Sequence, residues 1–293
     1  MVFTLLVGMN ACNRDEIFER EQYKNVFALV SDDGYNIFTV VHDLDEPESI
    51  GYVAASCGGT NPTLENIDIT MELSKESFDR YNIANFDRDS TKYAHLLSPE
   101  QYGIDSWNFT IPAGKTSGKL PLSIKPEGLS PDSVYFIPLK VSAVSAYEVN
   151  PDKSDVLYCV QIKNQYATQQ TATNYSMLGV RNGVNIMGQK RMHPISANKV
   201  RIMAGTEAFE SKIATINKSA VILEIDEDNN VNISTYQDMV VTQVNGDPTY
   251  PNIFKIVDDG YRTYKTFLLR YDYQVGSTTY EMKEELRLEF KED

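Results

Sequence analysis

The sequence is poor in cysteine, and this limits the metal and redox sites it can build. It contains three cysteines, Cys12, Cys57 and Cys159, with no C-x-x-C pair and no zinc-ligand spacing. Cys57 and Cys159 either pair in space or remain free thiols, and the sequence leaves both open. Two buried free thiols are favoured, because free cysteine is among the most buried residue types.

Catalytic motifs are absent as well. There is no H-E-x-x-H, G-x-S-x-G or G-x-G-x-x-G. The three histidines, His42, His95 and His193, are far apart in the sequence and are interpreted as structural or surface residues. Without geometry, no pair among the 41 acidic residues is assigned as a glycosidase pair. We therefore expect no cofactor, no bound metal and no enzyme activity.

Basic residues are scarce relative to acidic ones. Lys and Arg number 27 against 41 Asp and Glu, which gives a formal net charge of -14. Because such a surface repels phosphate backbones, we expect no nucleic-acid partner. The same charge disfavours nonspecific adsorption to anionic lipid.

Long apolar runs are also missing, and the run at the N-terminus is short. Val2 to Gly8 is too short for a spanning helix, which needs about 20 residues, and it lacks the basic start of a complete secretory signal. Met9-Asn10-Ala11-Cys12 then resembles a bacterial lipoprotein cleavage box, in which the cysteine is lipidated. We interpret residues 1–11 as a truncated lipoprotein signal and Cys12 as the lipidation site. The alternative is a core strand that begins at Met1.

The residues that follow Cys12 favour the lipoprotein interpretation. Arg14, Asp15 and Glu16 resemble the surface-export signal of Bacteroidetes lipoproteins, a basic residue followed by two acidic ones. Residues 12–24 are polar and charged, as expected of a tether. Several acyl chains on one cysteine anchor firmly, because each buried methylene contributes about 0.8 kcal/mol. The expected location is the outer membrane, lipid-anchored and facing the cell exterior.

The rest of the chain is dominated by strand patterns. Residues 65–73 alternate apolar and polar side chains, and so do residues 279–290, where Glu284 is the one polar residue on the apolar side. Residues 74–82 predict a short helix with Ser74 as its N-cap. Many short strands separated by Gly, Pro and Asx turns indicate an all-β protein.

Two β domains are predicted. Residues 25–163 form an N-terminal β-sandwich, residues 164–174 have no core-forming pattern and act as a linker, and residues 175–293 form a second antiparallel β domain, a sandwich or a barrel-like structure.

Several stretches carry a family likeness. "CGGTNPTLENIDITMELSKESFDRYN", "NFTIPAGKTSGKLPLSI" and "VYFIPLKVSAVSAYEVN" resemble the N-terminal module of a Bacteroidetes family of two-domain surface lipoproteins of unknown function. That module also occurs in some surface endo-β-N-acetylglucosaminidases. The ending "FLLRYDYQVGSTTYEMKEELRLEF" resembles the β-rich second domain. The resemblance implies an immunoglobulin-like sandwich in front and a non-catalytic, carbohydrate-binding role in a glycan-utilisation system.

Carbohydrate binding needs aromatic faces and planar polar side chains, and loops of the second domain supply candidates. Trp107 alternates with Phe109 and Ile111, which favours a core position over a binding one. The remaining glycan-binding candidates are Tyr250, Tyr261, Tyr264, Asn182, Asn185 and Gln189.

Three functions remain open from the sequence. The first is a surface lipoprotein that binds a polysaccharide or oligosaccharide. The second is an assembly lipoprotein that holds an outer-membrane porter complex through an exposed sheet edge. The third is a glycan-active enzyme of unrecognised type, which would need a pocket with close titratable groups.

Overall fold

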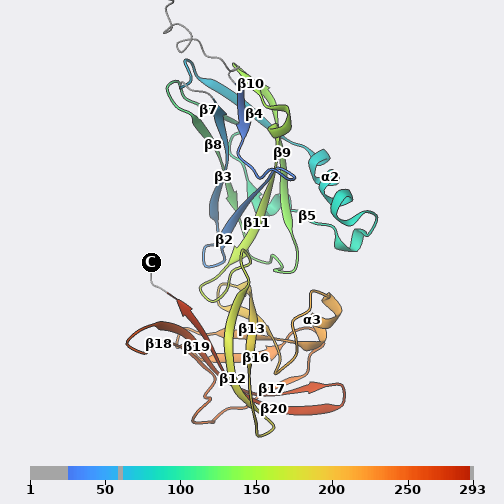
Figure 1. The fold of residues 1–293 in the computed structure, drawn as a ribbon, viewed down its shortest axis with the longest axis vertical. Coiled ribbons are helices and arrows are strands. Elements are labelled where there is room, and N and C mark those ends of the chain that lie inside the picture. The colour runs from blue at the N-terminus through green and yellow to red at the C-terminus, as the bar shows by residue number, and fades with distance from the viewer. Residues whose placement is uncertain (1–25, 59–61, 291–293) are drawn as a thin grey trace, which may run out of the picture.

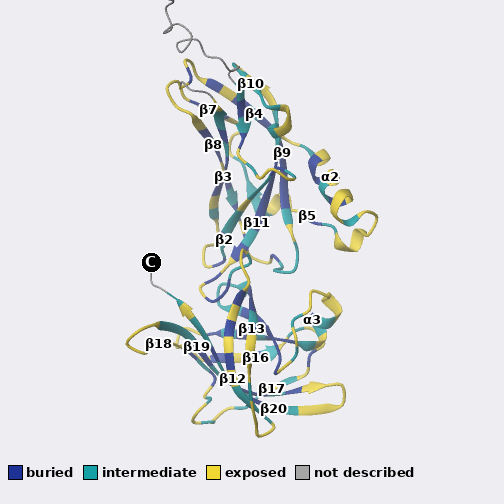
Figure 2. Cartoon of the chain, viewed as in Figure 1, coloured by how far each residue is buried: buried dark blue, intermediate teal, exposed yellow. Residues whose placement is uncertain are grey.

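The computed structural model describes residues 26–58 and 62–290, which form two β domains arranged end to end (Figure 1). Buried residues run along the strands of both domains, and exposed ones gather in the loops (Figure 2). The predicted signal, tether, Cys12, Arg14, Asp15 and Glu16 lie outside the described residues.

The first domain is the predicted sandwich of two sheets. One sheet has the order β10-β1-β3-β8-β6, and the other has the order β2-β11-β9-β4-β7 with β5 on β9. The core between them includes Phe27, Ile69, Leu122 and Tyr158, each at most 1% exposed. The strands are β1 (Val26–Leu29), β2 (Ile37–Asp43), β3 (Ser49–Gly58), β4 (Ile67–Leu73), β5 (His95–Leu96), β6 (Tyr102–Gly103), β7 (Asn108–Ile111), β8 (Ser117–Ile124), β9 (Tyr135–Val144), β10 (Glu148–Val149) and β11 (Asp155–Lys163).

The predicted helix is present and is longer than expected. Helix α2 (Lys75–Phe86) begins after Ser74, which is its N-cap residue as predicted, although the Ser74 side chain makes no capping hydrogen bond. Packing fixes the helix instead: Phe78 and Tyr81 lie edge-on to Phe136, with ring centroids 6.4 and 5.0 Å away. Three 3-10 turns complete the domain, η1 (Ser90–Lys92), η2 (Pro99–Gln101) and η3 (Pro151–Lys153).

The second domain is a nearly closed barrel. Its strand order is β16-β15-β14-β13-β12-β20-β19-β17, with β18 also on β19. Ile233 N donates to Gln243 Oε1 at 2.6 Å, which joins the two end strands, β16 and β17. The elements are β12 (Thr173–Arg181), β13 (Val184–Ser196), β14 (Lys199–Met203), α3 (Ile213–Ser219), β15 (Ala220–Ile225), β16 (Val231–Thr235), β17 (Val241–Gln243), β18 (Ile253–Asp258), β19 (Thr263–Val275) and β20 (Thr278–Phe290).

An ion pair lies inside this barrel. Lys190 Nζ is 2.8 Å from Glu284 Oε2 and also donates to Glu284 Oε1 and to the carbonyl of Met203. Tyr271 Oη donates to Glu284 Oε1 at 2.7 Å and accepts from the Gly205 N–H. Burial lowers the pKa of Lys190, while the Glu284 carboxylate opposes that shift. Glu284, the polar exception in the apolar pattern, is therefore a fully buried partner of a lysine.

Polar side chains build the joint between the domains. Arg201, 1% exposed in the second domain, makes two hydrogen bonds to Asp132 of the first, at 2.5 and 2.7 Å. Asn164 Nδ2 donates to the carbonyls of Ser196 and Lys199. Gln169 Nε2 donates to two carbonyls of the segment 131–133. The joint therefore restrains how the two domains are oriented.

Two cysteines and one histidine of the first domain are buried or half-buried. Cys57 and Cys159 are free thiols, of which Cys159 is buried and Cys57 is half-buried. His42 is fully buried between Ser49 Oγ and Tyr158 Oη, each 3.0 Å from a ring nitrogen. A Cβ on Gly51 would lie 1.8 Å from Tyr158 Oη, so only glycine leaves room for this arrangement.

We predict that the buried ion pair tolerates joint replacement better than the loss of one partner. Glu284→Gln leaves an unpaired buried ammonium and should lower the free energy of unfolding by roughly 3–5 kcal/mol. Lys190→Met combined with Glu284→Gln should cost less than either of these two changes alone. Denaturant unfolding of the four chains measures this, and additive losses would contradict it.

Stability should fall as the pH drops from about 6.5 to about 4. Burial lowers the pKa of both His42 and His193 to about 4. The unfolded chain then binds more protons than the folded chain between pH 6.5 and 4, so protonation favours unfolding in that window. Denaturant unfolding across these pH values should show a shallower slope for His42→Gln than for the native chain.

Candidate functional site

A tight hairpin joins β12 to β13 and sets the direction of their side chains. Asn182 and Gly183 form its two-residue loop with φ of 49° and 79°, the positive values that a type I′ turn requires. Tyr175 and Met177 of β12 and Lys190 of β13 point into the barrel. Because successive residues of a strand point to opposite sides, their neighbours form the outside of the sheet.

The outside of strands β13, β12, β20 and β19 forms one continuous surface, here called the outer face. Leu178 lies between Met187 on β13 and Glu285 on β20, and Leu268 on β19 follows. In the next row along the strands, Ser176 lies between Gln189 on β13 and Arg287 on β20. The outer face comprises Asn185, Met187, Gln189, Ser176, Leu178, Val180, Lys283, Glu285, Arg287, Tyr264 and Leu268. Thr266 and Arg270 point to the same side of β19 but are buried.

The loop 244–252 covers one end of this face. Asp247 Oδ2 is 2.9 Å from Lys283 Nζ, and Asn252 Oδ1 accepts from the Arg270 N–H at 2.6 Å. The Lys283 side chain and the N–H groups of Tyr250 and Thr249 hold the pKa of Asp247 at about 2. The loop is therefore tied to the sheet by its own charged and amide groups.

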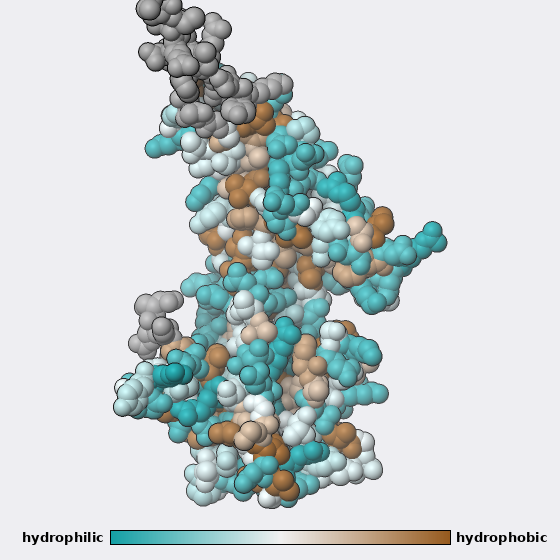
Figure 3. Space-filling view, viewed as in Figure 1, coloured by the Kyte–Doolittle hydropathy of each residue, from teal (hydrophilic) through white to brown (hydrophobic). Residues whose placement is uncertain are grey.

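Tyr250 projects from this loop to line a groove on the outer face. The groove has a volume of about 300 Å³, and Leu178, Val180, Met187 and Asn185 line it with Tyr250. An aromatic ring over an apolar floor with a single amide is typical of sites that orient a small organic ligand with few polar contacts. Figure 3 shows hydrophobic side chains gathered on the second domain, at its end remote from the first domain.

The cations in the middle of the outer face are engaged by carboxylates of the chain itself. Arg270 lies 2.6 Å from Asp272 and 3.0 Å from Glu281. Arg287 lies 3.5 Å from Glu285, and its guanidinium is 4.0 Å from the centre of the Tyr264 ring. These pairings leave amide, hydroxyl and apolar groups, rather than net positive charge, to meet a ligand.

The structure brings Tyr250 and Asn185 together at the groove and places Gln189 and Tyr264 on the same side of the sheet, further along the strands. Tyr250, Asn185, Gln189 and Tyr264 all lie on the outer face or over it. Asn182 is at its edge, where Asn182 Oδ1 accepts from the Glu281 N–H.

Two other candidates lie apart from this group. Tyr261 is 96% exposed at the turn between β18 and β19. Trp107 is half-buried against the core of the first domain and belongs to a different surface.

Sequence reasoning missed the apolar part of this groove. Met187 is 81% exposed and Leu178 is 55% exposed, although both lie within regular strands. The alternation of Leu178 with buried Met177 carried a signal, but the pairing of Leu178 with Met187 depends on the hairpin register.

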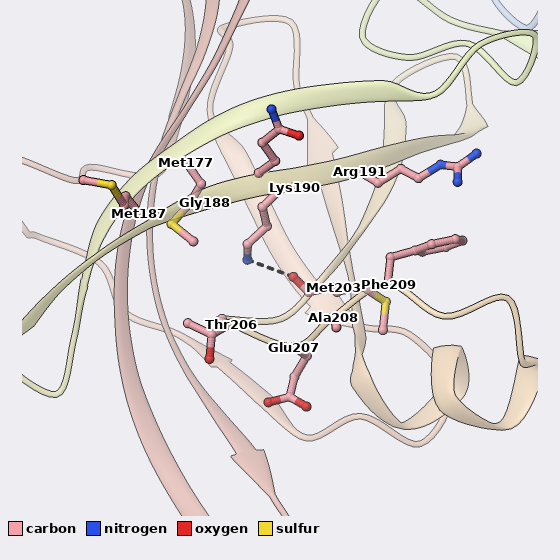
Figure 4. A pocket seen from close by; sticks show the side chains of 12 residues that line it. Met177, Met187, Gly188, Lys190, Arg191, Met203, Thr206, Glu207, Ala208 and Phe209 are labelled. Atoms are coloured by element: carbon pink, nitrogen blue, oxygen red, sulfur yellow. Dashed lines mark hydrogen bonds between the residues drawn. The ribbon is translucent and has the colours of Figure 1, made fainter.

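A second hollow lies inside the barrel wall, between β13 and the segment 203–209 (Figure 4). Its volume is about 180 Å³, and Lys190 points into it toward the Met203 carbonyl. The Lys190 ammonium is paired with Glu284, so this lysine is not available in the hollow as a base or a nucleophile.

The first domain contains a larger and more polar hollow of about 520 Å³. Its lining includes Arg80, Lys140, Lys153 and Asp155 but no aromatic side chain. Arg80 is already paired with Asp155 at 2.9 Å. This hollow therefore lacks the aromatic side chain that the groove at Tyr250 has.

The described part of the chain contains no metal-ligand cluster and no membrane-spanning helix. Residues 26–58 and 62–290 hold no group of three or more His, Cys, Asp or Glu side chains that could bind a metal ion. Within the same residues, no helix has the length and apolar character needed to cross a membrane.

Comparisons with known proteins place both domains. Family models described as an N-terminal domain and a C-terminal domain match residues 22–148 and 154–287. A protein of unknown function from Bacteroides ovatus is 17% identical, with a TM-score of 0.63 and coverage of 94% of this chain and 93% of that chain. A multidomain protein including DUF1735, also from B. ovatus, is 15% identical, with a TM-score of 0.64 and coverage of 92% and 95%.

An auxiliary nutrient binding protein from Bacteroides thetaiotaomicron has the same fold at 14% identity. Its TM-score is 0.57, with coverage of 88% of this chain and 92% of that chain. No curated protein matches the chain. The two family models together span most of the chain, so the chain belongs to the families that these domain models define, and the Bacteroides structures share its fold; both findings confirm the resemblance seen in the sequence.

Proposed function

We propose that this protein binds carbohydrate, without catalysis, as a lipid-anchored component of a glycan-utilisation system on the outer surface of the cell. The binding site is the groove at Tyr250 and the adjoining outer face of the second domain. The ligand is a polysaccharide or oligosaccharide, which the protein passes on to an outer-membrane porter.

One observation carries the binding part of the proposal. Tyr250 and Asn185 come from separate parts of the chain, yet the fold joins them in one groove, and Gln189 and Tyr264 lie on the same side of the same sheet. An apolar floor beneath Tyr250 supports contact with the apolar face of a sugar ring, while Asn185 and Gln189 can hydrogen-bond to its hydroxyl groups. The absence of net positive charge in the middle of the face favours neutral sugars.

The position of the first described strand is consistent with a lipid anchor near the N-terminus. Strand β1, the first described strand, lies beside β10 at the end of the first domain remote from the second (Figure 1). An anchor at Cys12 would therefore leave the outer face at the far end from the membrane. The nutrient-binding relative of the same fold lends further support.

Tyr250→Ala should weaken binding to the preferred neutral polysaccharide by roughly tenfold, because one aromatic contact is lost. Affinity electrophoresis of the native chain against a panel of neutral and acidic polysaccharides identifies the ligand, and the variant is then run in the same gel.

Tyr52→Ala is the matched control, because Tyr52 is a 44% exposed tyrosine on β3 of the first domain. It should run as the native chain does. A native chain that no polysaccharide retards would contradict the proposed function. Equal retardation of the Tyr250 variant and the native chain would show that the binding site lies elsewhere on the protein.

Cys12→Ala should abolish membrane anchoring. When the chain is produced behind a complete lipoprotein signal in a Bacteroides host, the native protein should take up labelled palmitate and enter the detergent phase of a Triton X-114 partition. The variant should do neither, because its anchor carries no acyl chain. Palmitate labelling of the variant would show that Cys12 is not the lipidation site.

A further inference from the structure

Strand β13 has one side that pairs with no other strand over much of its length. It pairs with β12 from Val184 to Met192, but with β14 only from His193 onward. Along residues 185–191 the strand therefore has an open edge, which borders the hollow shown in Figure 4.

The register identifies which main-chain groups this edge presents. Asn182 N donates to Glu281 O, so the even-numbered residues of β12 face β20 and the odd-numbered ones face β13. Arg181 lies opposite Val184, so the even-numbered residues of β13 bond to β12. The N–H and C=O groups of Asn185, Met187, Gln189 and Arg191 therefore point to the open side.

These four residues make no main-chain hydrogen bond on that side within residues 26–58 and 62–290. Asn185, Met187 and Gln189 are exposed residues. The segment 203–209 lies on the other side of the hollow, at a position where a neighbouring strand would otherwise continue the barrel. An unpaired edge of this kind is a template for strand addition.

Arg191 gives the edge a charge preference. Its guanidinium lies 4.8 Å from the centre of the Phe209 ring, and no carboxylate is within ion-pair distance of it among the described residues. The arginines at the centre of the outer face, in contrast, are each paired with an acid. An added strand that carries a carboxylate opposite Arg191 would complete this pair.

We propose that the open edge of β13 binds an extended segment of a partner protein by β-strand addition, with an acidic side chain of that segment against Arg191. The added strand bonds to the main chain of Asn185, Met187, Gln189 and Arg191. Its side chains alternate between the outer face and the hollow beside Lys190. This gives the protein a means of joining a surface assembly, independently of carbohydrate binding.

The probe is a fluorescein-labelled peptide that alternates threonine and valine around one central glutamate, titrated with the whole chain by fluorescence anisotropy. The native chain should bind it saturably and bind a glutamine version more weakly. Met187→Pro should weaken binding on the order of tenfold, because it removes a donor of the open edge. The fold should survive, since proline is accepted on edge strands whose N–H faces outward.

Met187→Ala is the matched control, since it loses the same side chain but keeps the N–H, and it should bind as the native chain does. Arg191→Gln should bind both peptides equally. Amide hydrogen exchange at Met187, Gln189 and Arg191 should slow when the peptide binds, and the thermal unfolding of each variant reports its folding. No saturable binding to the native chain, or no protection of these amides, overturns the proposal.

Discussion

The buried pair of Lys190 and Glu284 is the interaction on which the second domain depends. A charge in an apolar interior is costly unless it is paired, so these two side chains must meet inside the barrel. Because strand residues alternate, an inward Lys190 sends Gln189 outward, and an inward Glu284 sends Lys283 and Glu285 outward. The pair therefore sets the register of the strands whose other side is the outer face.

The space for this pair comes from the strand that lies between its two partners. Gly179 of β12 lies opposite Glu284, and a Cβ there would be 2.4 Å from the Lys283 carbonyl oxygen. A glycine at this point allows β12 and β20 to approach closely. Tyr271 supplies a hydroxyl to the same carboxylate and links it to Gly205, so the ion pair also fixes the start of the segment 203–209. The buried ion pair and its neighbours therefore influence the position of both β12, which lines the groove, and the segment 203–209, which lines the hollow.

Strand β13 consequently presents two different surfaces. Its side chains Asn185, Met187 and Gln189 belong to the outer face, while the main chain of the same residues forms the open edge. A sugar and a peptide strand would therefore use different atoms of one element. The joint at Asp132 and Arg201 restrains both surfaces relative to the first domain.

The sequence by itself determined the features that depend on local residue patterns and on composition. Alternation at residues 65–73 and 279–290 predicted strands with one buried side, and strands β4 and β20 lie there. Scarce cysteine, histidine and basic residues limited the chemistry. The alternation also identified Glu284 as the one polar residue on the apolar side of its strand, but it did not identify Lys190 as the partner of Glu284.

Only the tertiary structure decided which distant residues meet. Lys190 is 94 positions from Glu284 in the sequence. Tyr250 and Asn185 line one groove because the loop that carries Tyr250 lies over the paired strands β12 and β13. Ser74 is the N-cap residue of helix α2 without a side-chain hydrogen bond, and the contacts of Phe78 and Tyr81 with Phe136 hold that helix. Pairing between remote strands depends on cooperative burial and register across the whole sheet, and no local pattern in the sequence encodes it.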